Sequence, residues 1–377
     1  MCSYIKFQLT NPNEIAQVNE PCKCPETFRS RLQMQFMNGV LVTGANGYIG
    51  NAVCRAFVQA GWIVYGLVRK LDTFPDLAAE EIIPIQGSIG DNSFVPVLLA
   101  QQQTFNVIVS TTEMLWKFES HFQDIVSMLL AVSEKSNEAG VRPLVMFTSG
   151  CKDYGMTGRA DSEDLAPHTE ASPLNPPAVV AERCLASPKI FEYPHAFDAV
   201  ILRPTTVFGR SGSYYGPFFE LAQVAKETTT PLILPADPTS IVHGTHVDDC
   251  ANAYLSIAES NRARVAGQCY NVSSRRYETL DEIAEVLVEE YGLEKGIVYD
   301  PPQNKPVDQF DIVQFLTGFS QWVGSDKLRQ DVGWKDERLL FTEGLKAYRL
   351  AYEAAAKSGH SNVTRVKGYM KAFATSN

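Results

Sequence analysis

The chain has 377 residues with 43 acidic and 33 basic side chains, which gives a formal net charge of −10 at pH 7. This acidic balance argues against a nucleic-acid partner, because binding a phosphate backbone requires a basic face. The eight cysteines do not form the pattern of a disulfide framework or a zinc site, and no apolar run has the length of a membrane span or the order of a signal peptide. We therefore expect a cytoplasmic protein without a metal or membrane partner, which binds a small molecule.

The first predicted elements surround a glycine-rich turn. Residues 1–37 carry Asn-Pro, Pro-Cys and Cys-Pro breaks without periodicity, so we expect an irregular extension there. The apolar run from Val40 then ends in three glycines spaced by three residues, which lead into an apolar-periodic helix. Such glycines permit a tight turn, the approach of a pyrophosphate and close packing of the helix on the strand. The turn therefore predicts a dinucleotide site made by Gly44, Asn46, Gly47, Tyr48, Ile49 and Gly50.

Further apolar runs predict a sheet built from alternating strands and helices. Strands are expected at 62–68, 82–85, 107–110, 144–148 and 199–203, and the clearest helix at 122–138. Strict alternation indicates the α/β class, with a doubly wound parallel sheet covered on both faces. The regular alternation of predicted strands and helices ends beyond residue 203. We expect a dinucleotide-binding domain over 38–203 with later returns near 241–272, and a smaller, discontinuous C-terminal substrate lobe over 204–240 and 273–377.

The loops that follow the strands hold the candidate site, because ligands of a doubly wound sheet bind at the carboxyl ends of its strands. Arg69 and Lys70 follow the second strand, where a basic pair suits a 2′-phosphate, so they favour NADP(H) over NAD(H). Ser110 and Thr111 come after the fourth strand and Thr148 ends the fifth. Small hydroxyl side chains at these positions are expected beside a nicotinamide, although ordinary capping of a strand end produces the same residue types.

Six short segments form an ordered set along the chain. They are Thr43–Gly50, Thr148–Gly155, Leu202–Gly209, His246–Tyr254, Tyr270–Val272 and Val332–Trp334. Together they resemble the extended short-chain dehydrogenase/reductases of the NAD-dependent epimerase/dehydratase type. The resemblance implies a Rossmann domain, a bound NAD(P) with Pro204 at its site, a substrate lobe and often a homodimer joined by a helical bundle. The apolar face of the 122–138 helix is the local feature that supports such a dimer.

The chain departs from this family at the catalytic residues. The family uses a Tyr, a Lys four residues later, and a Ser or Thr after the fifth strand. Alignment places the Tyr and Lys on Leu174 and Ala178, or on Pro177 and Ala181, and neither choice provides the required side chains. General acid–base help is worth about 10²–10⁴-fold in rate, so another group must supply the proton or the reaction must not need one.

Polar residues near these loops are candidates for the missing acid and base. Tyr154 and His168 come first, and a nearby Lys152 would lower the pKa of Tyr154. Ser149 can replace the family's hydroxyl, whose own position falls on Gly150. Each candidate has a structural alternative, namely packing for Tyr154 and a surface loop for His168. The further candidates are Asp153, Glu170 and Cys151 in catalysis, and Glu113, Tyr214, Tyr215 and His243 at the substrate.

Three functions are compatible with this pattern. The first is an NAD(P)-dependent oxidoreductase or epimerase that acts on a small organic carbonyl or alcohol with a relocated acid/base. The second reuses the fold for non-redox lyase, isomerase or cyclase chemistry. The third is a catalytically silent nucleotide-binding regulator. The intact glycine turn favours the first function, whereas the missing Tyr and Lys favour the other two.

Overall fold

A parallel sheet of seven strands forms the centre of the molecule, which was analysed as a computed structural model describing residues 38–114, 117–212, 214–301 and 311–374. The expected extension over 1–37 lies outside the described residues. Every neighbouring pair of strands in the sheet is parallel. In spatial order the strands are β11 (Cys269–Val272), β6 (Asp198–Pro204), β5 (Leu144–Thr148), β4 (Val107–Ser110), β1 (Gly39–Thr43), β2 (Ile63–Val68) and β3 (Ile83–Gln86). The predicted α/β class and doubly wound parallel sheet are confirmed.

Side chains from the central strands alternate between two apolar cores, one on each face of the sheet. In β1, Val40 and Val42 belong to the core that also holds buried residues of α2 (Tyr48–Gln59) and α8 (Val247–Glu259). Leu41, between them, belongs to the opposite core with residues of α4 (Val95–Gln101) and α5 (Phe118–Glu138). This period of two is what a strand buried on both faces requires.

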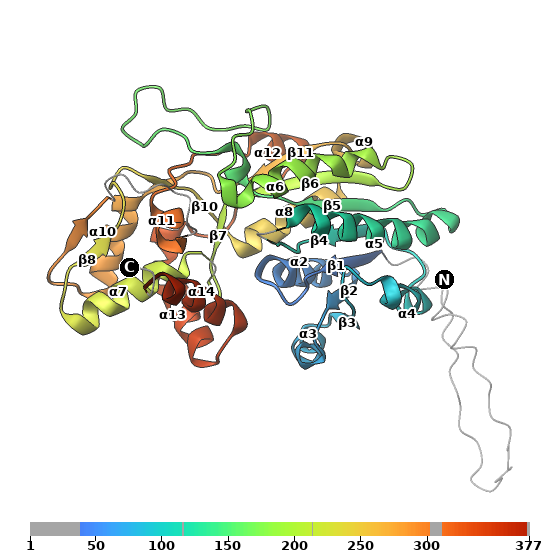
Figure 1. Cartoon of the computed structure of the whole chain (residues 1–377), viewed down its shortest axis with the longest axis horizontal. Coiled ribbons are helices and arrows are strands. Elements are labelled where there is room, and N and C mark those ends of the chain that lie inside the picture. The colour runs from blue at the N-terminus through green and yellow to red at the C-terminus, as the bar shows by residue number, and fades with distance from the viewer. Residues whose placement is uncertain (1–37, 115–116, 213, 302–310, 375–377) are drawn as a thin grey trace, which may run out of the picture. The chain divides into compact units, whose positions relative to one another are not determined.

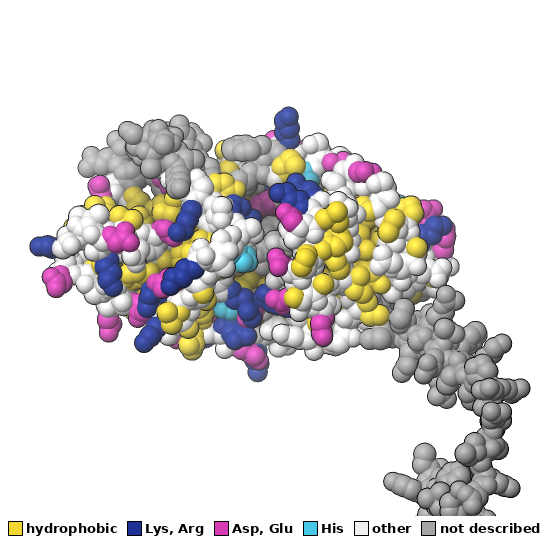
Figure 2. All heavy atoms as spheres, turned by 90° about the horizontal axis from the view of Figure 1, so that it is seen from below, with side chains coloured by type: hydrophobic (Ala, Val, Ile, Leu, Met, Phe, Trp, Pro, Cys, Tyr) yellow, Lys and Arg dark blue, Asp and Glu magenta, His cyan; other side chains and the backbone are white. Residues whose placement is uncertain are grey.

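The helix expected at 122–138 is α5, which begins four residues earlier at Phe118. Its apolar side chains, including Phe122, Met128 and Leu129, are fully buried against the sheet. That face is therefore used within the chain and gives no support to a dimer. Figure 2, which views the molecule from below, shows apolar side chains gathered over the right half of this face. Leu71, Ile83 and Val97 are among the exposed apolar residues of the described chain.

A second lobe of helices and short strands lies beside the sheet, to its left in Figure 1. Its core is formed by apolar residues of several helices and of two short parallel strands. The helices are α7 (Gly216–Thr228), α10 (Leu280–Tyr291), α11 (Ile312–Thr317), α13 (Phe341–Lys357) and α14 (Ser361–Ala374), and the strands are β8 (Leu232–Leu234) and β13 (Ile297–Tyr299). Two further pairs are β7 (Thr206–Phe208) with β10 (Gly244–His246), and β9 (Ile241–Val242) with β12 (Glu278–Thr279).

The remaining elements connect or flank these parts. None of the helices in the described ranges combines the length and the apolar character that crossing a bilayer demands. The connecting helices are α3 (Phe74–Ala79), α6 (Ala178–Ala186), α9 (Arg262–Val265) and α12 (Asp326–Val332), together with short 3₁₀ turns at Leu71–Thr73, Asn92–Phe94, Cys151–Tyr154 and Ser187–Glu192.

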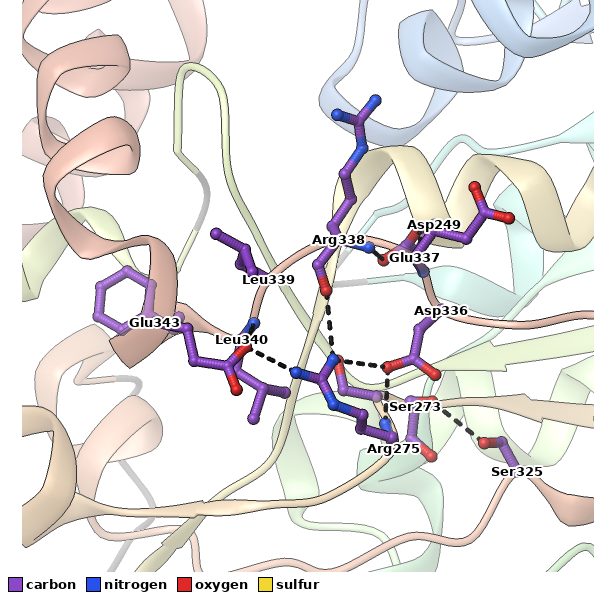
Figure 3. Close-up of polar contacts among 12 residues, drawn as sticks. Asp249, Ser273, Arg275, Ser325, Asp336, Glu337, Arg338, Leu339, Leu340 and Glu343 are labelled. Carbon is purple, nitrogen blue, oxygen red and sulfur yellow. Dashed lines mark hydrogen bonds and ion pairs between the residues drawn. The ribbon is translucent and has the colours of Figure 1, made fainter.

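A buried carboxylate at the start of α8 ties the sheet to the last part of the chain (Figure 3). Asp249 accepts the backbone N–H groups of Glu337 and Arg338 at 3.1 and 3.0 Å. Arg275 extends the contact by pairing with both Asp336 and Glu343. We call this set of contacts the Asp249 clamp. It fixes the segment that leads into α13 and so positions the terminal helices of the lobe.

Candidate functional site

A cleft of about 1250 Å³, part of it open to solvent, lies where the carboxyl ends of the strands face the second lobe. On the sheet side it is lined by the start of α2, the loops after β4 and β5, the middle of α6 and the β6–β7 connection. The lobe contributes Tyr214, Phe315 of α11, and Arg365 and Tyr369 of α14. This is the edge at which ligands of a doubly wound sheet bind.

The glycine turn between β1 and α2 forms one wall of the cleft. Gly44 has a φ of +68°, a conformation that favours glycine, and its carbonyl accepts the N–H of Gly47 at 2.8 Å. A Cβ at Gly50 would lie 2.6 Å from Thr111 Oγ1 and closer still to the carbonyl oxygen of Gly44. Gly44 thus makes the turn, and Gly50 allows the helix to pack against the ends of β1 and β4.

The N-terminus of α2 fits a dinucleotide pyrophosphate. The helix starts without a side-chain cap and has no acidic residue in its first turn. Residues Gly47–Gly50 line the cleft, so the N–H groups of the first turn are available to an anion there. Tyr48 holds the turn in place, because its hydroxyl donates to the carbonyl of Gly209 at 2.5 Å. The backbone of this chain therefore provides the anion site that an NAD(P) cofactor needs.

The other predicted cofactor residues divide into two groups. Pro204 and Thr111 line the cleft, and the Thr111 hydroxyl donates to the carbonyl of Thr43 at 2.6 Å. Ser110 is buried, and its hydroxyl has no hydrogen-bond partner among the described residues. Ser110 does not border the cleft, and neither do five other predicted residues. These are Gly44 and Asn46 in the turn, Arg69 and Lys70, which are exposed after β2, and Thr148, whose hydroxyl contacts that of Tyr254 at 2.8 Å.

A buried ion-pair network lies at the end of β5. Asp153 has no exposed surface, and it pairs with Arg183 at 2.9 Å and with Arg203 at 3.5 Å. It also accepts the hydroxyl of Ser149 at 2.5 Å. Arg183 makes a second ion pair, with Glu113 in the loop after β4. The network therefore joins the loops after β4 and β5 to α6 directly beneath the cleft.

Arg183 also explains the glycine at the position of the family's Ser or Thr. A Cβ on Gly150 would lie 3.0 Å from Arg183 Nη2, which is already held by Asp153. The two positions expected for the family's Lys, Ala178 and Ala181, fall on α6, where the side chains that reach the cleft are Val180 and Arg183. Arg183 thus borders both Gly150 and the cleft.

Lys152 points into the same cleft between two aromatic rings. Its Nζ lies 3.9 Å from the ring centre of Phe319 and 4.4 Å from that of Phe315, and it donates to the carbonyl of Phe315 at 3.3 Å. No carboxylate of the described residues lies within ion-pair distance of it. Burial, with a smaller contribution from the like charge of Arg183, lowers the pKa of Lys152 to about 7.

Tyr154 and His168, the first candidates from the sequence, do not border the cleft. The Tyr154 hydroxyl donates to Asn271 Oδ1 at 2.8 Å and accepts from Arg203 at 3.1 Å, and burial raises its pKa. The His168 ring stacks on that of Tyr154 with 5.4 Å between centres, and burial lowers its pKa. These surroundings argue against a catalytic role, because the Tyr154 ring is buried and the half-buried His168 ring is stacked on it. Glu170 likewise accepts the backbone N–H of Asn271 at 2.8 Å.

The four predicted substrate residues also fall into two groups. Glu113 and Tyr214 line the cleft. Tyr215 is fully buried among the aromatic side chains of the lobe core, so it is a packing residue. His243 is fixed between the carbonyl of Ser274 at 3.1 Å and the N–H of Val323 at 3.2 Å, and burial lowers its pKa to about 4. The latter two predictions are corrected, since neither side chain reaches the cleft.

Cys151 lines the cleft but is a poor nucleophile. Its thiol donates to the carbonyl of Arg203 at 2.8 Å, and burial raises its pKa well above the usual range.

Several cleft residues had not been predicted from the sequence. The most important is Arg183. It is the one charged side chain on the buried face of α6, and this pattern in the sequence could have identified it as a candidate site residue. Arg365 and Tyr369 are four residues apart and therefore share one face of α14. Their spacing indicates a common face, but nothing in the sequence shows that this face meets the glycine turn.

The chain matches the family model described as "NAD dependent epimerase/dehydratase family" over residues 40–273. It is similar to the spore coat polysaccharide biosynthesis protein SpsK of Bacillus subtilis, with 25% identity over 70% of this chain and 82% of that protein. It is also similar to a UDP-glucose 4-epimerase of Azospirillum brasilense, with 24% identity over 83% of this chain and 91% of that protein.

Solved structures show the same fold. A dTDP-glucose 4,6-dehydratase from Bacillus anthracis in complex with NAD superposes with a TM-score of 0.64, at 16% identity, over 84% of this chain and 97% of that one. A UDP-glucose 4-epimerase from Thermotoga maritima with UDP-glucose gives 0.62, at 18% identity, over 84% and 99%. The resemblance seen in the sequence is confirmed, and the chain is an NAD(P)-binding enzyme that belongs to the NAD-dependent epimerase/dehydratase family.

Proposed function

We propose that this enzyme interconverts a hydroxyl and a carbonyl group of a small organic substrate, with NADP(H) as the preferred cofactor and an acid/base other than the family's Tyr and Lys. One observation carries the proposal. The uncapped N-terminus of α2 and a set of titratable side chains from the β4 and β5 loops line one continuous cleft. A nicotinamide cofactor bound there supplies or accepts the hydride.

The chain's own residues perform three tasks in this proposal. The first turn of α2 binds the pyrophosphate through its N–H groups and the helix dipole. Pro204 and Val207 form part of the cleft wall between the sheet and the lobe, which limits the access of water to the reacting atoms. Tyr214 and Arg365, from the lobe, face the substrate side of the cleft and present a hydroxyl and a positive charge to it.

The preference for NADP(H) rests on the end of β2. Arg69 and Lys70 are both exposed there, so their charges are free to approach a 2′-phosphate on the adenosine ribose. Neither residue forms an ion pair with the described carboxylates. A basic pair at this position favours the phosphate over the ribose hydroxyls, which bind best to an acidic side chain.

The test starts with the purified full-length enzyme. The bound dinucleotide is identified by mass spectrometry, and NADPH and NADH are titrated against the protein. NADPH oxidation is then followed with a panel of aldehydes, ketones and oxidised sugars, and NADP⁺ reduction with the matching alcohols. Nucleotide sugars are included, because the name of one relative is UDP-glucose 4-epimerase. Turnover with a change in nicotinamide absorbance supports the proposal.

Three outcomes contradict it in different ways. Failure to bind either dinucleotide removes the cofactor assignment. Binding with conversion of a substrate but no net or transient change in the nicotinamide supports lyase, isomerase or cyclase chemistry. Binding without any conversion over the whole panel supports a nucleotide-binding regulator.

A further inference from the structure

A carbonyl reductase must deliver a proton to the substrate oxygen, and α6 offers no tyrosine or lysine for this step. The side chains at the β5 end of the cleft are therefore the place to look. Ser149 already donates to Asp153, and Cys151 to a carbonyl group. Arg183 does not release protons near neutral pH, and Glu113 is paired with it. Among the described residues at this end of the cleft, the amine of Lys152 is the remaining group that can exchange a proton.

The backbone around Lys152 is held rigidly. Gln321 Nε2 donates to the carbonyls of Cys151 and Gly155, at 2.7 and 2.6 Å, and so closes the turn from both sides. The Asp153 carbonyl accepts the N–H of Asn175 at 2.9 Å. A fixed backbone of this kind is what a proton-transferring side chain needs, because productive geometry tolerates only small displacements.

Burial of the Lys152 side chain favours the neutral amine, whereas the faces of Phe315 and Phe319 and the carbonyl of Phe315 attract the ammonium. Phe315 and Phe319 enclose it from the lobe, while Arg183 on α6 and the thiol of Cys151 are the nearest titratable or charged groups. Glu113, Tyr214 and Arg365 face it from across the cleft. With its pKa lowered to about 7, the amine and the ammonium are both populated near neutral pH, which is the condition for efficient acid–base catalysis.

We propose that Lys152 is the catalytic residue that donates a proton to the substrate oxygen during reduction and accepts it during oxidation, in place of the family's Tyr and Lys. The inference rests on the proposed function. In the reduction, the carbonyl carbon gains a hydride from the bound reduced nicotinamide, and the π electrons of the C=O bond move to oxygen. An N–H bond of the Lys152 ammonium breaks as the new O–H bond forms. The amine that remains then regains a proton from water.

The kinetic test uses the carbonyl and alcohol pair found in the substrate screen. Reduction needs the ammonium, so kcat is expected to fall as the pH rises above about 7, whereas oxidation needs the amine and kcat falls below about 7. Lys152→Met should lower kcat by about 10²–10⁴-fold in both directions, with KM nearly unchanged. Lys152→Arg keeps the charge without a transferable proton and should be equally slow.

A matched control separates this role from a general loss of charge. Lys189→Met removes an exposed lysine that pairs with Glu119 away from the cleft, and kcat should stay at the wild-type value. An increase in KM with kcat unchanged in Lys152→Met would overturn the inference, because it would mean that Lys152 only binds the substrate.

A second measurement needs no substrate and so distinguishes this inference from the proposed function. The folded chain releases the Lys152 proton near pH 7, while the unfolded chain retains it to near the ordinary value of 10.5. Between these pH values the unfolded state binds more protons, so the free energy of unfolding rises with pH. This rise should be present in wild type and in Lys189→Met but reduced in Lys152→Met. Parallel curves for all three proteins would show that Lys152 stays charged in the cleft, and would overturn the inference even if the enzyme proves active.

Discussion

Two strand-to-helix connections face the same cleft, and they are built by opposite means. The turn from β1 to α2 depends on the backbone: Gly44 adopts a positive φ, Gly50 allows close packing, and the N-terminus of α2 has no side-chain cap. The connection from β5 to α6 instead depends on side chains. Asp153 and Arg183 form a buried ion pair, and Arg183 and Lys152 line the cleft. The two connections therefore differ in how far they depend on the identity of their side chains. A backbone cradle serves any substrate, whereas catalytic side chains must suit one reaction.

The largest expected effect comes from breaking the β5–α6 connection at Arg183. Arg183→Met leaves the buried Asp153 with fewer partners, and we expect the free energy of unfolding to fall by about 3 kcal/mol in urea denaturation. The double variant Arg183→Met with Asp153→Asn removes both charges and should recover part of this loss. A double variant that is less stable than Arg183→Met alone would show that the pair is not the cause.

Substitution of Gly50 should disturb the packing of the β1–α2 turn. The new Cβ of Gly50→Ala would meet Thr111 Oγ1 at 2.6 Å, so we expect a loss of about 1–3 kcal/mol in unfolding free energy and weaker NADPH binding by titration. Gly368→Ala is the matched control, because its Cβ meets nothing within 4 Å and it lies on α14. That change should be neutral or slightly stabilising. Equal stability of the two variants would contradict the packing role of Gly50.

A change at the end of β2 tests whether side chains there alter the cofactor preference of the site formed by the β1–α2 turn. Replacing Arg69 and Lys70 with Gln should raise the dissociation constant of NADPH by about tenfold, which corresponds to about 1.4 kcal/mol, and leave that of NADH nearly unchanged. Fluorescence titration with each nucleotide measures both constants. If both nucleotides lost affinity equally, the preference for a 2′-phosphate would have no basis.

The smallest effect is expected at Tyr154, which lies in the β5–α6 connection but does not border the cleft. Tyr154→Phe removes hydrogen bonds to Asn271 and Arg203 but keeps the ring against His168, so stability should fall by about 1 kcal/mol. Turnover should hardly change, since the hydroxyl does not reach the cleft. A drop in kcat as large as that of Lys152→Met would restore Tyr154 as a catalytic residue.

Sequence patterns predicted the parts of this enzyme that depend on local chemistry. Apolar runs located the central strands, and the spacing of Gly44, Gly47 and Gly50 identified the turn, because both follow from backbone geometry within a few residues. The catalytic edge depends on contacts between distant segments. Tyr154 and Lys152 are two residues apart, yet one packs inward and the other faces the cleft, and only the tertiary contacts of Gln321 and Phe315 decide which.

The cleft also has an order of assembly. Gly47 is synthesised long before Arg365 and Tyr369, and all three line the same cleft. Domains fold from the N-terminus during synthesis, so the cradle can form long before its opposite wall exists. The Asp249 clamp, which receives the N–H groups of Glu337 and Arg338, can close only after these two residues have been synthesised. A chain that stopped before α14 would therefore lack Arg365 and Tyr369 on the wall of the cleft opposite the glycine turn.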